Sequence, residues 1–249
     1  MSTKLCLIGH GKMGKMIAAL AAEKDCKVIS TIDPFAPDCH REINAESIGN
    51  ADVCLDFSHP SAALENMHKV IALGKAMVVG TTGWNDHLAE IRNLVAKANT
   101  GMVYGANYSI GMNIFSRICA DAVKYFDRFA AYDVFGYEQH HNQKADSPSG
   151  TAIDLANLVL QNSSRKTEAL FDTAKRKIES HELHFTSLRA GSIPGTHTIG
   201  FDSEADTIEL THRVRSRTSF AYGAIQAAVW ISERKGCHSF SDMISEILC

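Results

Sequence analysis

A glycine loop near the N-terminus constrains the fold of this chain more than any other feature. Residues 9–14 read Gly-His-Gly-Lys-Met-Gly, which fits the spacing G-x-G-x-x-G. The loop lies between an apolar run, Leu5–Ile8, and a helical stripe of apolar residues that ends at Leu20. In this pattern the first glycine permits a tight turn, the second lets the backbone approach a pyrophosphate, and the third lets the helix pack close to the strand. The order strand, loop, helix predicts the first βαβ unit of a parallel sheet.

Short apolar runs alternate with helical stripes through the first hundred residues. The almost wholly apolar runs are typical of a parallel sheet that is covered on both faces. Because strands alternate with helices, the sequence predicts right-handed βαβ units and a doubly wound α/β domain. The predicted strands are Leu5–Ile8, Val28–Ile32, Val53–Phe57, Ala76–Val79 and Met102–Tyr104.

The pattern changes after about residue 108. Helices are predicted at 114–126, after a Pro-Ser-Gly turn at 148–150, and at 218–234, whereas the polar segment 163–180 is expected to be a surface helix or loop. Strands are predicted at 131–138, 183–188, 197–201 and 207–212. Helices mixed with clustered strands, which we expect to be antiparallel, indicate a second domain of the α+β class.

Composition narrows the classes of function. The 249 residues carry 25 basic and 28 acidic side chains, a net charge of -3, so no positive excess favours nucleic acid or an anionic membrane as a partner. The seven cysteines are scattered without a Cys-x-x-Cys pair, which argues against a metal site or a disulfide framework. No apolar run approaches the roughly 20 residues that span a bilayer, and the N-terminus lacks a signal peptide. We expect a reduced, soluble, cytoplasmic protein.

An aspartate strengthens the interpretation of the glycine loop. Asp33 ends the second predicted strand, about twenty residues beyond the loop. A carboxylate there can accept hydrogen bonds from an adenosine ribose and would repel a 2′-phosphate. The simpler interpretation is a glycine-rich turn beside a surface aspartate. The complete context instead predicts a dinucleotide site, with further contacts at later strand ends. The candidate cofactor-binding residues are Gly9, Gly11, Lys12, Met13, Gly14, Asp33, Gly80, Thr81, Thr82, Ala106, Asn107, Tyr108 and Ser109.

The densest chemical segment is residues 138–152, Glu-Gln-His-His-Asn-Gln-Lys-Ala-Asp-Ser-Pro-Ser-Gly-Thr-Ala. Histidine titrates near neutrality and can donate a proton, and Lys144 adds a fixed positive charge. The predicted helix that starts at 149–151 offers its first N–H groups to an anion. These parts suit a small substrate that carries carboxylates and must be protonated. A polar loop with an ordinary helix cap is the simpler alternative, and the spacing does not favour a metal site.

This segment resembles the signature E-x-H-H-x-x-K-x-D-x-P-S-G-T-A of the 4-hydroxy-tetrahydrodipicolinate reductase family, also called dihydrodipicolinate reductases. Other segments resemble the family too: Asp-Phe-Ser at 56–58, Gly-Thr-Thr-Gly at 80–83, and Asn-Tyr-Ser-Ile-Gly-Met-Asn at 107–113. The resemblance covers essentially the whole chain.

The resemblance implies a Rossmann-like doubly wound parallel sheet with an inserted α+β central domain. Residues 1–109 and 218–249 would bind the dinucleotide, and residues 110–217 would bind substrate and assemble a homotetramer. The implied reaction is the reduction of dehydrated 4-hydroxy-tetrahydrodipicolinate, a small cyclic dicarboxylate, to tetrahydrodipicolinate by NADH or NADPH, in lysine and diaminopimelate biosynthesis. By resemblance, His140 and Lys144 are the catalytic proton donors. The implied substrate-binding residues are His141, Ser149, Gly150 and Thr151.

Two further expectations concern specificity. Many family members have an arginine after the acidic residue, whereas Pro34 follows Asp33 here, so we expect a preference for NADH. Arg189 and Arg217 are further candidates for a substrate carboxylate. Two other functions stay open at this point: a related nicotinamide reductase for another oxo or imino acid, and a dinucleotide-sensing module without turnover.

Overall fold

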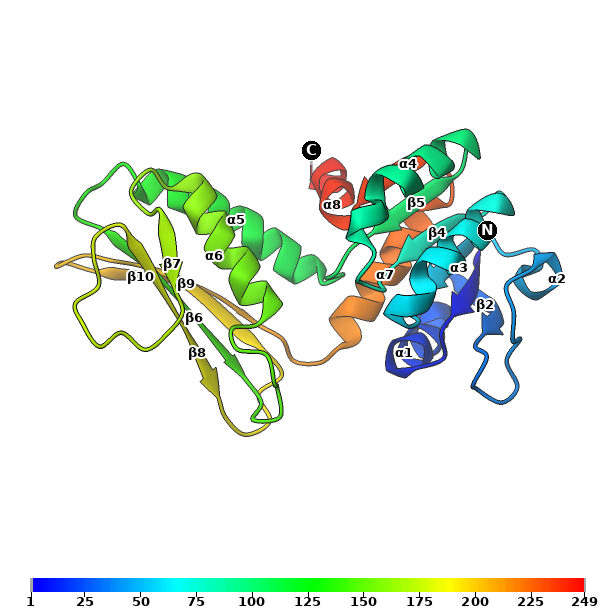
Figure 1. Cartoon of the computed structure of the whole chain (residues 1–249), viewed down its shortest axis with the longest axis horizontal. Coiled ribbons are helices and arrows are strands. Elements are labelled where there is room, and N and C mark those ends of the chain that lie inside the picture. The colour runs from blue at the N-terminus through cyan, green and yellow to red at the C-terminus, as the bar shows by residue number, and fades with distance from the viewer. Residues whose placement is uncertain (1, 249) are drawn as a thin grey trace. The chain divides into compact units, whose positions relative to one another are not determined.

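The computed structural model describes residues 2–248 and divides them into two compact units. The first unit contains the chain up to Ile110 and again from Thr218 onward, and the second unit is Gly111–Arg217. Each unit contains its own sheet (Figure 1).

The first unit holds a six-stranded parallel sheet in the order β11-β5-β4-β3-β1-β2. Strand order reverses between β1 and β3, so their carboxyl ends border the crevice where doubly wound sheets bind ligands. Its elements are β1 (Thr3–Ile8), α1 (Lys12–Ala21), the short 3₁₀ turn η1 (Ala22–Lys24), β2 (Cys26–Ile32), α2 (Ala45–Ile48), β3 (Val53–Asp56), α3 (Pro60–Ala72), β4 (Ala76–Val79), η2 (Asn85–His87), α4 (Leu88–Lys97), β5 (Gly101–Tyr104), α7 (Thr218–Ile231), β11 (Gly236–Ser239) and α8 (Phe240–Leu248).

Helices pack against both faces of this sheet, which is why its central strands are apolar throughout. Helix α7 contacts α1 and strands β1, β3, β4 and β5, and α3 contacts α4. Every residue of β3 is buried, and Met67 of α3 packs in one cluster with Cys54 of β3 and Met77 of β4. The return of α7 to the first sheet explains how residues more than 200 positions apart share one core.

The second unit holds a five-stranded mixed sheet in the order β10-β9-β6-β8-β7. Strand β9 is antiparallel to β6 and β10, whereas β8 is parallel to both β6 and β7. The expectation of antiparallel strands was therefore wrong for β8, because helix α6 and the segment after it carry the chain back to the same end of the sheet. The elements are α5 (Ile110–Phe126), β6 (Asp133–His140), α6 (Gly150–Asn162), β7 (Glu168–Leu170), β8 (Glu182–Arg189), β9 (Thr196–Asp202) and β10 (Thr207–Arg213).

Helices α5 and α6 cover one face of this sheet (Figure 1). Alternate residues of β6 are buried, including Val134, which packs with Phe115 of α5 and Val159 of α6. The other set points to the opposite face, where the rings of Phe135 and Tyr137 stack 6.4 Å apart. Burial therefore alternates along β6 because helices of the same unit cover only one face of the sheet.

Several short elements were not predicted from the sequence, among them α2, β7, β11 and α8. Strand β7 interrupts the polar segment 163–180, and β11 and α8 follow α7 at the end of the chain. Both strands are short, at 3 and 4 residues, so neither shows a measurable period. Among residues 2–248, no helix combines the length and the apolar character needed to cross a bilayer.

Candidate active site

The glycine loop at the end of β1 has the close contacts that its spacing predicts. Gly9 has φ +97°, and a Cβ there would lie 2.5 Å from the carbonyl oxygen of Phe57. A Cβ on Gly14 would lie 2.1 Å from the Gly9 carbonyl oxygen. At Gly11 a Cβ would meet no atom within 4 Å, so two glycines close the turn and the middle one faces open space. That arrangement fits a pyrophosphate lying against the backbone.

The first turn of α1 follows directly on the glycine loop. Gly11 is the N-cap residue and makes no side-chain capping bond. The N–H groups of Lys12, Met13 and Gly14 lie in the first helical turn, where N–H groups have no acceptor within the helix. These donors and the helix dipole together favour an anion.

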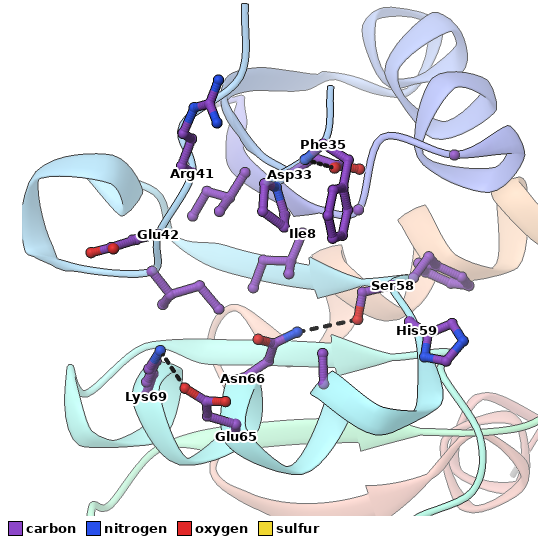
Figure 2. Close-up of a pocket in the computed structure, with 17 residues that line it drawn as sticks. Ile8, Asp33, Phe35, Arg41, Glu42, Ser58, His59, Glu65, Asn66 and Lys69 are labelled. Carbon is purple, nitrogen blue, oxygen red and sulfur yellow. Dashed lines mark hydrogen bonds and ion pairs between the residues drawn. The ribbon is translucent and has the colours of Figure 1, made fainter. Parts of the chain in front are cut away.

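A cavity of about 410 Å³ lies beside the loop at the carboxyl ends of β1, β2 and β3. Figure 2 shows Asp33, Phe35 and Arg41 on one side of this cavity and Ser58, His59 and Asn66 on the other. Phe35 is 95% exposed although its ring borders the cavity. An exposed ring at the rim offers a flat apolar face to a base. Neither Phe35 nor Arg41 was predicted from the sequence, because neither belongs to a motif.

Asp33 shapes the rim of the cavity as well as facing it. One carboxylate oxygen accepts from His10 N–H at 2.7 Å, and the other accepts from Phe35 N–H at 2.9 Å and Ala36 N–H at 3.2 Å. Partial burial would raise the pKa of Asp33, but these N–H groups outweigh it, so the pKa lies below its usual value. The ionised carboxylate thus joins the glycine loop to the loop after β2.

Asp56 joins the ends of β3 and β4 in the same way. Its side chain is fully buried and accepts from the Ser58 hydroxyl at 2.7 Å, the Thr81 hydroxyl at 2.6 Å and the Asn66 amide at 2.9 Å, as well as from Ser58 N–H at 3.0 Å. Thr81, a candidate cofactor residue, therefore has its hydroxyl directed to Asp56. The neighbouring Thr82 is exposed.

Tyr108 has its side chain inside the first unit. It is 2% exposed, and its hydroxyl donates to the carbonyl oxygens of Val79 and Val103 at 2.9 and 3.1 Å. A side-chain contact from Tyr108 to a cofactor is therefore unsupported. Its neighbours Ala106 and Asn107 are more accessible at the end of β5.

In the second unit, the candidate residues gather around a buried carboxylate, Glu138, near the end of β6. Glu138 is fully buried. One of its oxygens accepts from Ser149 N–H at 2.9 Å, from the Ser187 hydroxyl at 2.8 Å and from the Arg189 guanidinium at 2.8 Å. The other accepts from the Ser149 hydroxyl. Burial would raise the pKa of Glu138, but hydrogen bonds from His197, Ser149 and Arg189 hold it well below its usual range.

Two histidines lie against the same carboxylate. His140 Nδ1 is 3.1 Å from one Glu138 oxygen, without the alignment of a hydrogen bond, and His197 Nε2 is 3.5 Å from it. Burial lowers the pKa of His140 to about 4, with Glu138 opposing the shift and the charges of His197, Lys144 and Arg189 adding to it. His140 is thus neutral near pH 7 in the free protein. His197 reaches the cluster from β9, where it is paired with Glu138.

Lys144 and Arg189 supply the positive charges. Lys144 Nζ lies 2.7 and 2.8 Å from the two carboxylate oxygens of Asp146. Arg189 donates to Glu138 and to the Asp146 carbonyl oxygen at 2.6 Å. Arg189 is therefore engaged inside the unit, and its expected contact with a substrate carboxylate stays a prediction, as does that of Arg217.

The candidate substrate residues at and near the N-terminus of α6 are of two kinds, buried and accessible. Ser149 is 3% exposed, and its hydroxyl donates to Glu138 and accepts from Ala152 N–H at 3.2 Å as the helix cap. Its side chain therefore supports the turn. The N–H groups of Gly150 and Thr151 belong to the first turn and have no intrahelical acceptors. Gly150 is exposed, and Thr151 and His141 are half-buried, so these three are available to a ligand.

Glu138, His140 and His197 also place one potential metal-ligand atom each within 4.8 Å of one another. The carboxylate, however, already accepts four hydrogen bonds, one of them from the Arg189 guanidinium. A cation would lie beside that guanidinium and displace a donor. The cluster is better described as a hydrogen-bonded network that keeps a carboxylate ionised.

Comparisons with known proteins cover both units. A family model described as "Dihydrodipicolinate reductase, N-terminus" matches residues 3–108, and one described as "Dihydrodipicolinate reductase, C-terminus" matches residues 111–244. The chain is 33% identical over 243 residues to a 4-hydroxy-tetrahydrodipicolinate reductase of Christiangramia forsetii, covering 98% of each chain. It is 34% identical to one of Campylobacter curvus, covering 94% of this chain and 95% of the other.

A solved structure agrees with the fold. A dipicolinate-bound dihydrodipicolinate reductase from Paenisporosarcina sp. TG-14 superposes with a TM-score of 0.81 at 22% identity, covering 98% of this chain and 100% of the other. At this identity the likeness concerns the fold alone. It confirms the expected combination of a doubly wound parallel sheet with an inserted α+β region.

Proposed function

The chain belongs to the dihydrodipicolinate reductase family, and from this membership and its two candidate sites we infer that it is a 4-hydroxy-tetrahydrodipicolinate reductase. It is an NAD(P)H-dependent oxidoreductase of lysine and diaminopimelate biosynthesis, and its substrate is a small cyclic dicarboxylate. The observation that carries this conclusion is the full-length similarity to reductases at 33% identity. A sensing module without turnover and a reductase for an unrelated acid are correspondingly disfavoured.

The first unit fits the dinucleotide. We propose that the N–H groups at the start of α1 hold the pyrophosphate, that Asp33 accepts hydrogen bonds from the adenosine ribose, and that Phe35 lies against the base. Of the remaining candidate cofactor residues, Thr82, Ala106 and Asn107 are accessible at strand ends. When bound, NAD(P)H supplies the hydride for the reduction.

The second unit fits the substrate. We propose that the N–H groups of Gly150 and Thr151, together with His141, hold substrate carboxylates through the helix terminus and hydrogen bonds. Hydride addition places negative charge on the conjugated imine system, and the Lys144 ammonium stabilises that charge and can deliver the proton. His140 is neutral near pH 7 in the free protein, and a bound dicarboxylate would favour its protonation by charge attraction.

A direct assay tests the function. Purified protein mixed with freshly generated 4-hydroxy-tetrahydrodipicolinate and NADH should oxidise the nicotinamide, which is followed by its absorbance. Binding of NADH without oxidation would favour a sensing module. Oxidation only with another oxo or imino acid would show a related reductase of different specificity.

We also propose that NADH is preferred over NADPH. Asp33 is ionised at the rim of the cavity and would repel a 2′-phosphate. Arg41 lines the same cavity. Its guanidinium can attract the 2′-phosphate of NADPH, so we expect both cofactors to be used. Asp33→Ser should lower kcat/KM for NADH and raise the ratio of NADPH to NADH use by about tenfold. An NADPH advantage in the unaltered protein would contradict the preference.

The open sheet face of the second unit supports a homotetramer as a further proposal. On that face Tyr137 donates to Glu209 at 3.2 Å, and Leu188 is 50% exposed. Burial of such a half-apolar face against another copy would be favourable. Light scattering of the purified protein measures the subunit number, and a monomer would refute the proposal. Because the reaction draws on the pool of reduced nicotinamide nucleotides, we propose the cytoplasm as its location.

A further inference from the structure

Helix α6 is tethered at both ends by carboxylates, and the two tethers differ in what else they touch. At its C-terminal end, Asp127 accepts from the hydroxyl of Ser163, the C-cap residue, at 2.5 Å and from Ser164 N–H at 2.9 Å. At its N-terminal end, Glu138 accepts from both the N–H and the hydroxyl of Ser149, the N-cap residue. Each carboxylate also meets an arginine, Arg165 and Arg189 respectively.

Within residues 2–248, histidines contact the N-terminal tether, Glu138, but not the C-terminal tether, Asp127. Glu138 faces His140 and His197 at 3.1 and 3.5 Å, and His140 is on the same strand two residues away. One rigid carboxylate thus joins the first turn of α6 to the His140 ring. Because Glu138 is fully buried and accepts four hydrogen bonds, it has little freedom to move.

We propose that Glu138 is a positioning residue for the reduction, which fixes the N–H groups of Gly150 and Thr151 and the His140 imidazole in one relation to each other. This proposal rests on the function inferred above. Glu138 has no exposed surface, so it acts on a ligand through these neighbours. Its carboxylate accepts a hydrogen bond from Ser149 N–H. The N–H groups of Gly150 and Thr151, which follow in the helix, remain available to an anion.

The geometry explains why a charged acceptor is needed at this position. The donors around Glu138 are two hydroxyls, one backbone N–H and one guanidinium. An ionised carboxylate accepts from all of them, whereas a glutamine offers one acceptor oxygen and adds two N–H donors. Glutamine would therefore break the tether to Ser149 or to Arg189, and the Arg189 charge would lose its partner.

The test is Glu138→Gln with the activity measured at varied substrate and varied NADH. We expect KM for the dicarboxylate to rise about tenfold or more and kcat to fall, because misplacement of binding groups by fractions of an ångström weakens catalysis. KM for NADH should stay within twofold of its original value, since the dinucleotide candidates all belong to the first unit. Wild-type kinetics for the substrate would overturn the proposal.

Asp127→Asn is the matched control, because Asp127 tethers the other end of the same helix with a similar set of donors. Loosening α6 in general would raise KM for the substrate equally in both variants and would overturn the proposal. The expected result is a near-normal KM in Asp127→Asn. If Glu138→Gln fails to fold, Ser149→Ala removes the hydroxyl arm of the tether together with the cap to Ala152 N–H, and keeps the bond from Ser149 N–H to Glu138. A rise of a few fold in substrate KM would then support the proposal, and no rise would refute it.

The titration of His140, followed by NMR, gives a second readout, which should be unchanged in the control Asp127→Asn. The charged and titratable groups that face His140 are Glu138, His197, Lys144 and Arg189. In Glu138→Gln the ring is no longer held in its buried position, so the pKa of His140 should rise from about 4 toward its ordinary value of about 6.5. If the ring stays in place, loss of the Glu138 charge lowers the pKa of His140 further, and that result would overturn the proposal.

The activity of the unaltered protein distinguishes a wrong proposed function from a wrong role for Glu138. If the unaltered protein does not reduce the dicarboxylate, the proposed function is wrong. If the unaltered protein is active and Glu138→Gln is indistinguishable from it in substrate KM and in His140 titration, only the positioning role is wrong.

Discussion

Asp56 and Glu138 are two fully buried carboxylates at strand ends, one in each unit. Both gather the loops of a candidate site, but their partners differ in charge. Asp56 accepts from hydroxyls, an amide and a backbone N–H, all of them neutral. Glu138 accepts from a guanidinium as well and has two imidazoles against it.

The difference fits the division of work that we propose for the two units. In the proposed function, backbone N–H groups and the helix dipole meet the charge of a dinucleotide in the first unit, so that site needs shape and few ionisable side chains. We propose that a proton moves and negative charge develops at the second unit, which calls for titratable and cationic groups. A carboxylate with neutral partners suits the first task, and one among cations and histidines suits the second.

The largest expected effect comes from Lys144, the cation that we place at the reacting centre. Lys144→Met should lower kcat by about 10²- to 10⁴-fold, the usual contribution of a positioned proton donor. Binding of NADH, measured by fluorescence titration, should be unchanged because the residue lies in the second unit. A loss confined to KM would show that Lys144 binds the substrate without taking part in proton transfer, and would weaken the division of work between the units.

A smaller effect is expected at Asp56. Asp56→Asn keeps the size of the side chain but loses the charge that strengthens four hydrogen bonds. We expect KM for NADH to rise about tenfold, equivalent to about 1.4 kcal/mol, and the urea midpoint of unfolding to fall. Kinetics at varied substrate should show an unchanged KM for the dicarboxylate. If that KM rises as much as KM for NADH, the two carboxylates do not serve separate ligands.

The pH dependence of unfolding should distinguish the contributions of His140 and Glu138 to the stability of the second unit. The folded pKa of His140 is about 4, below its value of about 6.5 in the unfolded chain, so the unfolded state binds more protons between these pH values. Stability is therefore full above about pH 6.5 and falls as the pH drops toward 4. Glu138, whose pKa is lowered, adds a further loss below about pH 4.5. Urea unfolding at several pH values should show a weaker loss between pH 6.5 and 4 in His140→Gln, and an unchanged slope would contradict the assignment.

Local sequence patterns predicted most of the elements of the first unit. The glycine spacing, the apolar runs and the position of Asp33 depend on neighbours in sequence, because each strand and its following turn form one local unit. Strand β11 was not predicted, because its four residues gain their place only by pairing with β5. Tyr108 stays a cofactor candidate through its backbone alone, because its hydroxyl donates to carbonyl oxygens of β4 and β5.

In the second unit, the sequence located the candidate segment but not the contacts within it. The family resemblance implies that Ser149 binds substrate, and the structure adds that its hydroxyl donates to Glu138 of another element. Arg189 and His197 lie more than 45 positions from Glu138, and no local pattern links them. Their meeting depends on the parallel pairing of β6 with β8 and the antiparallel pairing with β9.

The sequence by itself determined which groups the two candidate sites contain: a glycine turn that opens a helix, an acidic residue after the second strand, and a segment with histidines, lysine and a helix start. Those features are encoded by spacing within about twenty residues. Only the tertiary structure decided which groups remain free for ligands and which are consumed as internal supports, and what charge His140 carries. Burial and hydrogen-bond partners from distant strands determine these properties, because both depend on what lies nearby in space.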